Sequence, residues 1–160
     1  MTNNDILRRI RYTFDYSDSK MIAIFALADS EVSREQVCNW LKREGDVDYQ
    51  DCSDPLFAAF LNGFINEKRG KKEGGQPAPE QKLTNNIIFR KIKIALNLQA
   101  EEVLAILAQA DMHLSKHELS ALFRKPTHKN YRSCQDQVLR NFMQGVERRY
   151  RPDESIETED

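Results

Sequence analysis

The chain has 160 residues, of which 40% are hydrophobic and 31% charged, and its formal net charge is −1. This composition predicts a globular protein with enough apolar side chains for one ordinary domain or two small ones. The longest apolar run, residues 21–28, is too short to cross a membrane, and the first residues lack a basic and apolar leader. We therefore expect a cytoplasmic protein that does not associate with membranes.

Four amphipathic or apolar segments follow one another in the first half, each with the period of a helix. The first has an apolar stripe around Ile6 and Ile10, whereas the second, at about residues 18–29, is apolar on all sides. A helix without a polar face is expected at the buried centre of its bundle. Ser33 and Gln36 form a capping box that starts the third helix.

The fourth helix is predicted to begin at Asp54, which would act as its N-cap, with Pro55 in the favoured first position. Gly63 lies inside this helix, where glycine costs about 1 kcal/mol relative to alanine. A close backbone contact with another helix would compensate for this cost. We expect that contact between helices, and one option is a contact between the two halves of the chain.

The second half repeats the first. A shift of 82 residues aligns residues 2–69 with residues 84–151 without a gap, so that TNNDILRRIR is matched by TNNIIFRKIK. The fold class predicted is all-α, with two homologous four-helix units that arose by internal duplication and pack about a pseudo-two-fold axis. We place helical repeat 1 at residues 1–69, a flexible linker at 70–82, helical repeat 2 at 83–151 and an acidic, disordered tail at 152–160.

These motifs carry a family resemblance. The doubled TNN…R..I pattern, the A.AD motif before a capped helix and the C.D before the last helix resemble the YehS-like family of small bacterial proteins. That family consists of two tandem copies of a domain of unknown function. The resemblance implies a bacterial origin and the tandem arrangement, and it implies no reaction, ligand or partner.

One polar pair in the repeated opening helix is a candidate for ligand or partner contacts. Asn4 and Arg8 lie one helical turn apart, as do Asn86 and Arg90, and could present an amide and a guanidinium to an anionic or peptide ligand. The competing interpretation is structural: the conserved spacing of polar residues between the copies would then reflect helix caps and internal hydrogen bonds. In that interpretation Asp29 closes a turn or pairs with Arg8.

No catalytic or metal-binding group is predicted, and no cofactor. Cys52 and Cys134 recur without histidine or a second cysteine beside them, so a small buried thiol is favoured over a reactive one. His113 and His117 are four residues apart, but Ser115 is the expected helix cap between them. The sequence therefore indicates that the protein is not an enzyme.

Charge differs strongly between the repeats. Residues 2–69 contain nine basic and 12 acidic residues, whereas residues 84–151 contain 12 basic and six acidic residues. A basic stretch in the second repeat, with one tyrosine, is typical of contacts to phosphates and bases. The candidate nucleic-acid contacts are Arg124, Lys125, Lys129, Tyr131, Arg132 and Arg140. Two competing explanations are that this charge binds the acidic repeat or that it binds the acidic tail, within one chain or between chains.

These observations favour a non-enzymatic binding or adaptor protein that acts through protein–protein contacts, including self-association, at the surface between the repeats. The alternative is a nucleic-acid-binding protein that uses the basic surface of repeat 2. A partial helix-turn-helix pattern at residues 21–42 is a further alternative, although Glu31 stands where a glycine would ease the turn.

Overall fold

A computed structural model describes residues 1–151, so the predicted acidic tail lies outside the described part of the chain. Residues 1–151 form eight α-helices and no strand. The helices are α1 (Asn3–Phe14), α2 (Asp18–Leu27), α3 (Arg34–Leu41), α4 (Asp54–Arg69), α5 (Asn85–Ala95), α6 (Ala100–Gln109), α7 (Lys116–Leu122) and α8 (Asp136–Tyr150). The all-α fold and its four helices per repeat are confirmed.

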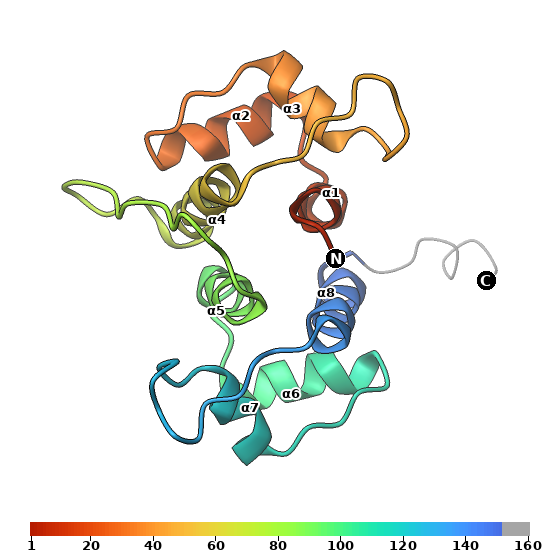
Figure 1. Ribbon diagram of the computed structural model, residues 1–160, viewed down its shortest axis with the longest axis vertical. Helices are drawn as coiled ribbons and strands as arrows, with labels where there is room; N and C mark the ends of the chain where they lie inside the picture. The colour runs from red at the N-terminus through yellow and green to blue at the C-terminus, as the bar shows by residue number, and fades with distance from the viewer. Residues whose placement is uncertain (152–160) are drawn as a thin grey trace.

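The two repeats pack against each other through their first and fourth helices at the centre of the molecule. The first helix of each repeat packs on the fourth helix of the other, so α1 lies against α8 and α5 lies against α4. The pairs α2–α3 and α6–α7 lie at opposite ends of this central group (Figure 1). This reciprocal packing is the arrangement that a pseudo-two-fold axis requires. We call the two contacts the α1–α8 seam and the α4–α5 seam.

Helix starts follow the local sequence signals. The Ser33 hydroxyl accepts a hydrogen bond from the Gln36 backbone N–H, and the Gln36 side-chain oxygen accepts one from the Ser33 backbone N–H. Ser115 and Glu118 form the same capping box in the second repeat. Thr2 forms a further capping box at the start of α1. Each box satisfies backbone N–H groups that the helix itself leaves free.

The fourth helix begins at Asp54, as predicted, but its N-cap differs from the prediction. Ser53 is the N-cap of α4, and its hydroxyl accepts a hydrogen bond from the Leu56 amide. The Asp54 carboxylate instead accepts bonds from the Asn3 amide at 2.8 Å and from the Leu83 backbone N–H at 2.8 Å. Asp54 therefore ties α4 to α1 and to the start of the second repeat, a role that depends on residues distant in sequence.

The expectation that α2 is the buried centre of the bundle is wrong. Ala23 and Ala26 are exposed, and only Met21, Ile24 and Phe25 of α2 are buried. The helix lies at the end of the molecule, where small side chains on its outer face expose little apolar area. The central element of the first repeat is α4, which packs on α2 within its own repeat and on α5 of the other.

Gly63 makes the close contact that its place in a helix predicted. A Cβ atom added there would lie 1.9 Å from the Ile24 backbone oxygen, and one added at Gly145 would lie 2.3 Å from the Ile106 oxygen. Both contacts join the second and fourth helices of one repeat. The option of a contact between the two copies is therefore wrong.

The linker crosses the α4–α5 seam. Residues 70–82 contain no helix, but the side chain of Asn66 donates to Gln76 at 2.7 Å, and the Lys91 ammonium donates to Glu80 at 2.7 Å. Lys91 is only 8% exposed, and Asn62 accepts its second hydrogen bond at 2.5 Å. A buried ammonium needs such partners, so the linker contributes a carboxylate that this seam requires.

Candidate functional site

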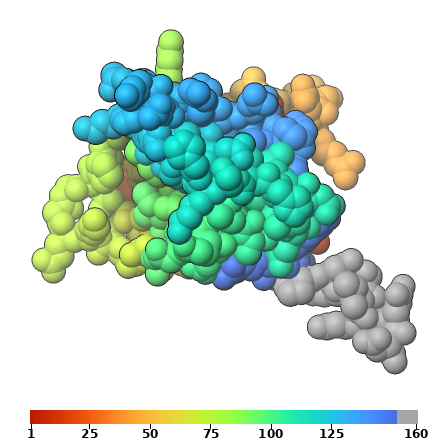
Figure 2. Space-filling model, turned by 90° about the horizontal axis from the view of Figure 1, so that it is seen from below, coloured from red at the N-terminus to blue at the C-terminus, as the bar shows by residue number. Residues whose placement is uncertain are grey.

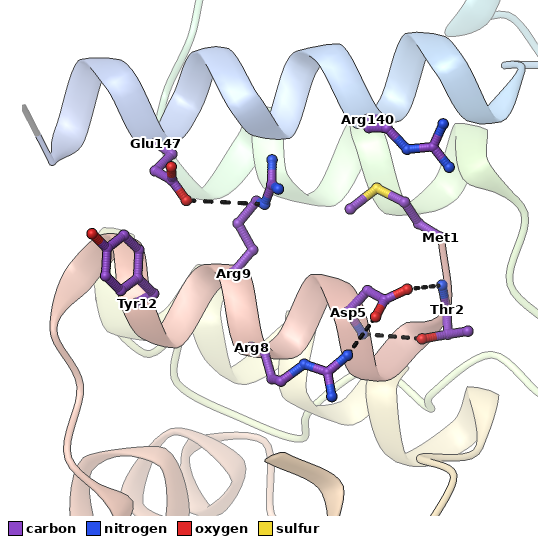
Figure 3. Close-up of a pocket in the computed structure, with 8 residues that line it drawn as sticks. All are labelled: Met1, Thr2, Asp5, Arg8, Arg9, Tyr12, Arg140 and Glu147. Atoms are coloured by element: carbon purple, nitrogen blue, oxygen red, sulfur yellow. Dashed lines mark hydrogen bonds and ion pairs between the residues drawn. The ribbon is translucent and has the colours of Figure 1, made fainter. Parts of the chain in front are cut away.

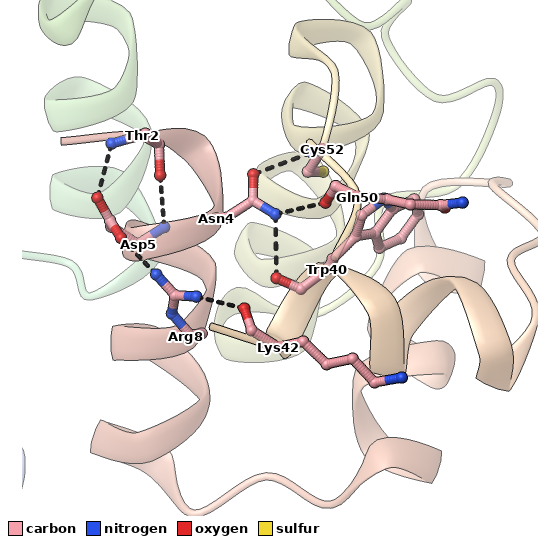
Figure 4. A network of polar contacts seen from close by, with 8 residues as sticks. All are labelled: Thr2, Asn4, Asp5, Arg8, Trp40, Lys42, Gln50 and Cys52. Atoms are coloured by element: carbon pink, nitrogen blue, oxygen red, sulfur yellow. Dashed lines mark hydrogen bonds and ion pairs between the residues drawn. The ribbon is translucent and has the colours of Figure 1, made fainter. Parts of the chain in front are cut away.

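Asn4 lies inside the first repeat with every polar atom of its side chain engaged (Figure 4). Its amide nitrogen donates to the backbone oxygens of Trp40 at 3.0 Å and Gln50 at 2.8 Å, and its oxygen accepts from the Cys52 N–H at 2.9 Å. The residue is 1% exposed. Asn4 therefore fastens the end of α3 and the α3–α4 loop to α1.

The second repeat contains the same network. Asn86 donates to the backbone oxygens of Leu122 at 2.9 Å and Arg132 at 2.8 Å, and accepts from the Cys134 N–H at 2.9 Å. Both amide hydrogens of each asparagine are thus used inside the protein. A ligand contact by either residue would require one of these buried bonds to break, so the structure favours the structural interpretation for the two asparagines.

Arg8 differs from Asn4 because it is only partly buried and meets a carboxylate. Its guanidinium donates to the Lys42 backbone oxygen at 2.6 Å and forms a close ion pair with Asp5 (Figure 4). Burial raises the pKa of the Asp5 carboxyl, but hydrogen bonds from Thr2 and Arg8 outweigh it and leave that pKa lowered. Asp29 does not pair with Arg8: it closes the turn after α2, with φ at 58°.

A cleft of about 490 Å³ opens along the α1–α8 seam (Figure 3). Its basic side chains are Arg8 and Arg9 from α1 and Arg140 from α8, and its acidic side chains are Asp5 and Glu147. The other lining residues are Met1, Thr2 and Tyr12. The cleft thus brings together Arg8 and Arg140, which the sequence had placed in two separate hypotheses.

Position 9 shows how the two seams differ. Arg9 aligns with Lys91, yet its side chain is 30% exposed, lies 4.0 Å from Glu147 and points from α1 toward α8 across the cleft (Figure 3). The aligned Lys91 is enclosed by Asn62 and Glu80. At this aligned position, the cation of the α4–α5 seam is buried and hydrogen-bonded, whereas the cation of the α1–α8 seam is accessible to solvent.

Arg9 and Glu147 were not predicted as functional residues. One signal was present in the aligned copies: Arg140 and Glu147 correspond to Ala58 and Ile65 in the first repeat. Where one repeat has a charged residue and the other has an apolar residue at the aligned position, the two seams are expected to differ in how far they exclude solvent.

The remaining predicted nucleic-acid contacts lie apart from the cleft. Lys125, Lys129 and Arg132 are exposed on the α7–α8 loop, where Arg124 and Tyr131 are partly buried. The loop projects along the upper edge of the molecule in Figure 2, on the same side as the α3–α4 loop. Residues 43–51 of that second loop contain four acidic residues and one basic residue. One face thus carries a basic loop at one end and an acidic loop at the other.

The two aligned cysteines, Cys52 and Cys134, are buried, and their thiols are not activated. Burial, together with the nearby Asp54 carboxylate, raises the pKa of the Cys52 thiol to about 12. Burial likewise raises the pKa of Cys134 to about 11. Within residues 1–151, no group of three or more histidine, cysteine, aspartate or glutamate side chains is placed to hold a metal ion.

No helix in the described part of the chain is both long and apolar enough to cross a bilayer. The helices form two copies of one four-helix unit. The first helix of each copy packs against the fourth helix of the other copy. The chain belongs to the family described as "Protein of unknown function (DUF1456)", whose profile matches it twice, at residues 3–70 and 85–151.

A relative in Escherichia coli (strain K12), named "Uncharacterized protein YehS", is 42% identical over 148 residues. The alignment covers 91% of this chain and 94% of that protein. The resemblance found from the repeated motifs is therefore confirmed. No solved structure matches the chain.

Proposed function

We propose that the protein is a non-enzymatic binding protein that engages an acidic segment of a partner protein in the cleft of the α1–α8 seam. The observation that carries the proposal is the set of three guanidinium groups along one cleft. Arg8 and Arg9 come from one repeat and Arg140 from the other, so the complete set exists only when the two repeats pack together.

The charges in the cleft favour an anionic partner. Three arginines face two carboxylates, those of Asp5 and Glu147. Asp5 binds Arg8 closely, whereas Glu147 approaches Arg9 only at 4.0 Å, and Arg140 contacts a neutral amide, that of Gln137. Arg9 and Arg140 therefore retain guanidinium N–H groups for carboxylates of a partner, and such charge-assisted hydrogen bonds are among the stronger contacts at interfaces.

Replacing two of the three cleft arginines with a neutral side chain should weaken partner binding. We expect the double variant Arg9→Gln/Arg140→Gln to lose a partner that the wild-type chain retains, with affinity reduced at least about tenfold because each lost charge-assisted bond is worth about 1.5 kcal/mol or more. The measurement is affinity capture from bacterial lysate with the full chain, quantified by mass spectrometry after nuclease treatment.

The matched control is Lys125→Gln/Lys129→Gln, which removes two positive charges from the α7–α8 loop instead of the cleft. It should retain the partner. If the cleft variant and the loop variant capture the same proteins as the wild type, the proposed binding surface is wrong.

Nucleic-acid binding is a second candidate, supported by the exposed basic residues Lys125, Lys129 and Arg132 beside Tyr131 on the α7–α8 loop. Phosphate contacts are strongest at low salt, so binding to generic duplex or single-stranded DNA and RNA should be measurable at about 50 mM salt and weaken steeply above it. The Lys125→Gln/Lys129→Gln variant should lose this binding and the cleft variant should keep it. Absence of binding at about 50 mM salt would exclude this candidate.

A further inference from the structure

A second cavity, of about 350 Å³, lies in the second repeat, and Glu80 of the linker also lines it. It is enclosed by the first turns of α5, the end of α7 and the loop that follows it. Its side chains combine cations with apolar surface. The lining residues are Glu80, Thr84, Asn86, Ile87, Arg90, Leu122, Phe123, Arg124, Pro126 and Tyr131.

The two arginines of this cavity lack a counter-charge. Arg90 is exposed and makes no hydrogen bond or ion pair to residues 1–151, whereas the Nη1 atom of the partly buried Arg124 is shielded from solvent without a hydrogen-bond partner. The one carboxylate in the lining belongs to Glu80, which is bound to Lys91 at 2.7 Å. A buried guanidinium nitrogen without a partner is costly, so the Nη1 atom of Arg124 is a candidate contact for a group that enters the cavity from solvent.

The first repeat shows which chemical group satisfies this arrangement. Arg8 aligns with Arg90, and it binds the carboxylate of Asp5. The residue that aligns with Asp5 is Ile87, which carries no charge. The first repeat therefore supplies its own carboxylate to the arginine of the opening helix, and the second repeat has replaced that carboxylate with an apolar side chain.

We propose that the cavity between α5 and the α7–α8 loop binds a carboxylate carried next to a small apolar group, with Arg90 and Arg124 holding the carboxylate. Ile87, Phe123 and Pro126 then contact the apolar group. The carboxylate of the ligand binds Arg90 as the Asp5 carboxylate binds Arg8 in the first repeat, which favours a carboxylate over a phosphate. This site is separate from the cleft of the α1–α8 seam and does not depend on the function proposed for that cleft.

The substitution Ile87→Asp tests the proposal because it gives the second repeat the carboxylate of the first. Ile87 occupies the third position of α5, where its amide donates to the Thr84 hydroxyl at 3.2 Å. In the first repeat, Asp5 at this position also accepts a bond from the Thr2 N–H at 3.0 Å. The introduced carboxylate should complete the same capping box, so the variant should fold and melt at a higher temperature while its cavity is filled from within.

The probe is N-acetylleucine, titrated at low salt while the Nε–H signals of the arginine side chains are followed by NMR. We expect shifts for the wild type and for Ile87→Asn, and binding at least about tenfold weaker for Ile87→Asp and for Arg90→Gln. The peptide acetyl-Leu-Glu-Leu-amide distinguishes a side-chain carboxylate from a free carboxylic acid. Whichever of the two binds more tightly identifies the source of the ligand.

Three results would overturn the proposal. N-acetylleucinamide, which lacks the carboxylate, would bind as well as N-acetylleucine; inorganic phosphate would bind more tightly than both carboxylates; or Ile87→Asp would bind the probe as the wild type does. The Arg9→Gln/Arg140→Gln variant should bind the probe normally. That variant can therefore lose the protein partner while it still binds the probe, so the two proposals are tested independently.

Discussion

Replacing Gly63 with alanine should lower the free energy of unfolding by about 3 kcal/mol, because overpacking of a close contact typically costs 1–3 kcal/mol. The new methyl group would lie 1.9 Å from the backbone oxygen of Ile24, and a backbone atom cannot rotate away as a side chain can. Helix propensity alone predicts the opposite sign, a gain of about 1 kcal/mol. Urea unfolding followed by circular dichroism measures the difference.

Gly145→Ala is the matched variant in the second repeat, where the distance to the Ile106 oxygen is 2.3 Å, and it should also destabilise. Gly75→Ala is the control, since nothing lies within 4 Å of its added Cβ atom, and it should change stability little. A Gly63→Ala protein as stable as the wild type would show that α2 and α4 do not approach as closely as described.

Replacing Asn4 with alanine should cost about 3 kcal/mol, since an unsatisfied buried polar group costs about 1–3 kcal/mol and three backbone groups lose their partner. Those groups are the oxygens of Trp40 and Gln50 and the N–H of Cys52. Thermal and urea unfolding measure the loss. Asn4→Asp should also destabilise, because its carboxylate would face two carbonyl oxygens without an amide hydrogen to donate.

Asn86→Ala provides the parallel test in the second repeat and should cost a similar amount. Arg9→Gln, on the same helix as Asn4 but partly exposed, should stay within about 0.5 kcal/mol of the wild type. If Asn4→Ala were no more destabilising than Arg9→Gln, the structural interpretation of the asparagine would be contradicted. Asn4 would then be free to contact a ligand.

The local features of the fold were predictable because they depend on neighbours in sequence. The capping boxes of Ser33 and Ser115 follow from residues three positions apart, and the gapless alignment of the two copies revealed the duplicated unit. Gly63 indicated a close helix contact because an unexplained glycine in a helix needs a packing reason. Its partner, Ile24, was not predictable, since that contact joins elements 39 residues apart.

The candidate site was predicted only in part. Arg8 and Arg140 were named, but for different functions, and their common cleft with Arg9 became visible only in the α1–α8 seam. For Asn4, one helical turn from Arg8, the sequence left open a ligand contact or an internal hydrogen bond. The structure places Asn4 inside, because the loop from Gln50 to Cys52 folds back over α1 and needs its amide.

By itself, the sequence determined that the protein is helical, where most helices begin and that the unit occurs twice, because caps, apolar periods and repeats are local patterns. Only the tertiary structure decided which helix lies at the centre and what the aligned cations do. Arg9 and Lys91 occupy the same repeat position, yet one lines an open cleft and the other is buried against Glu80. Their environments differ because the linker runs across only one of the two seams. An apolar period in the sequence predicts that a helix face is buried, but it does not predict which chemical groups will cover that face.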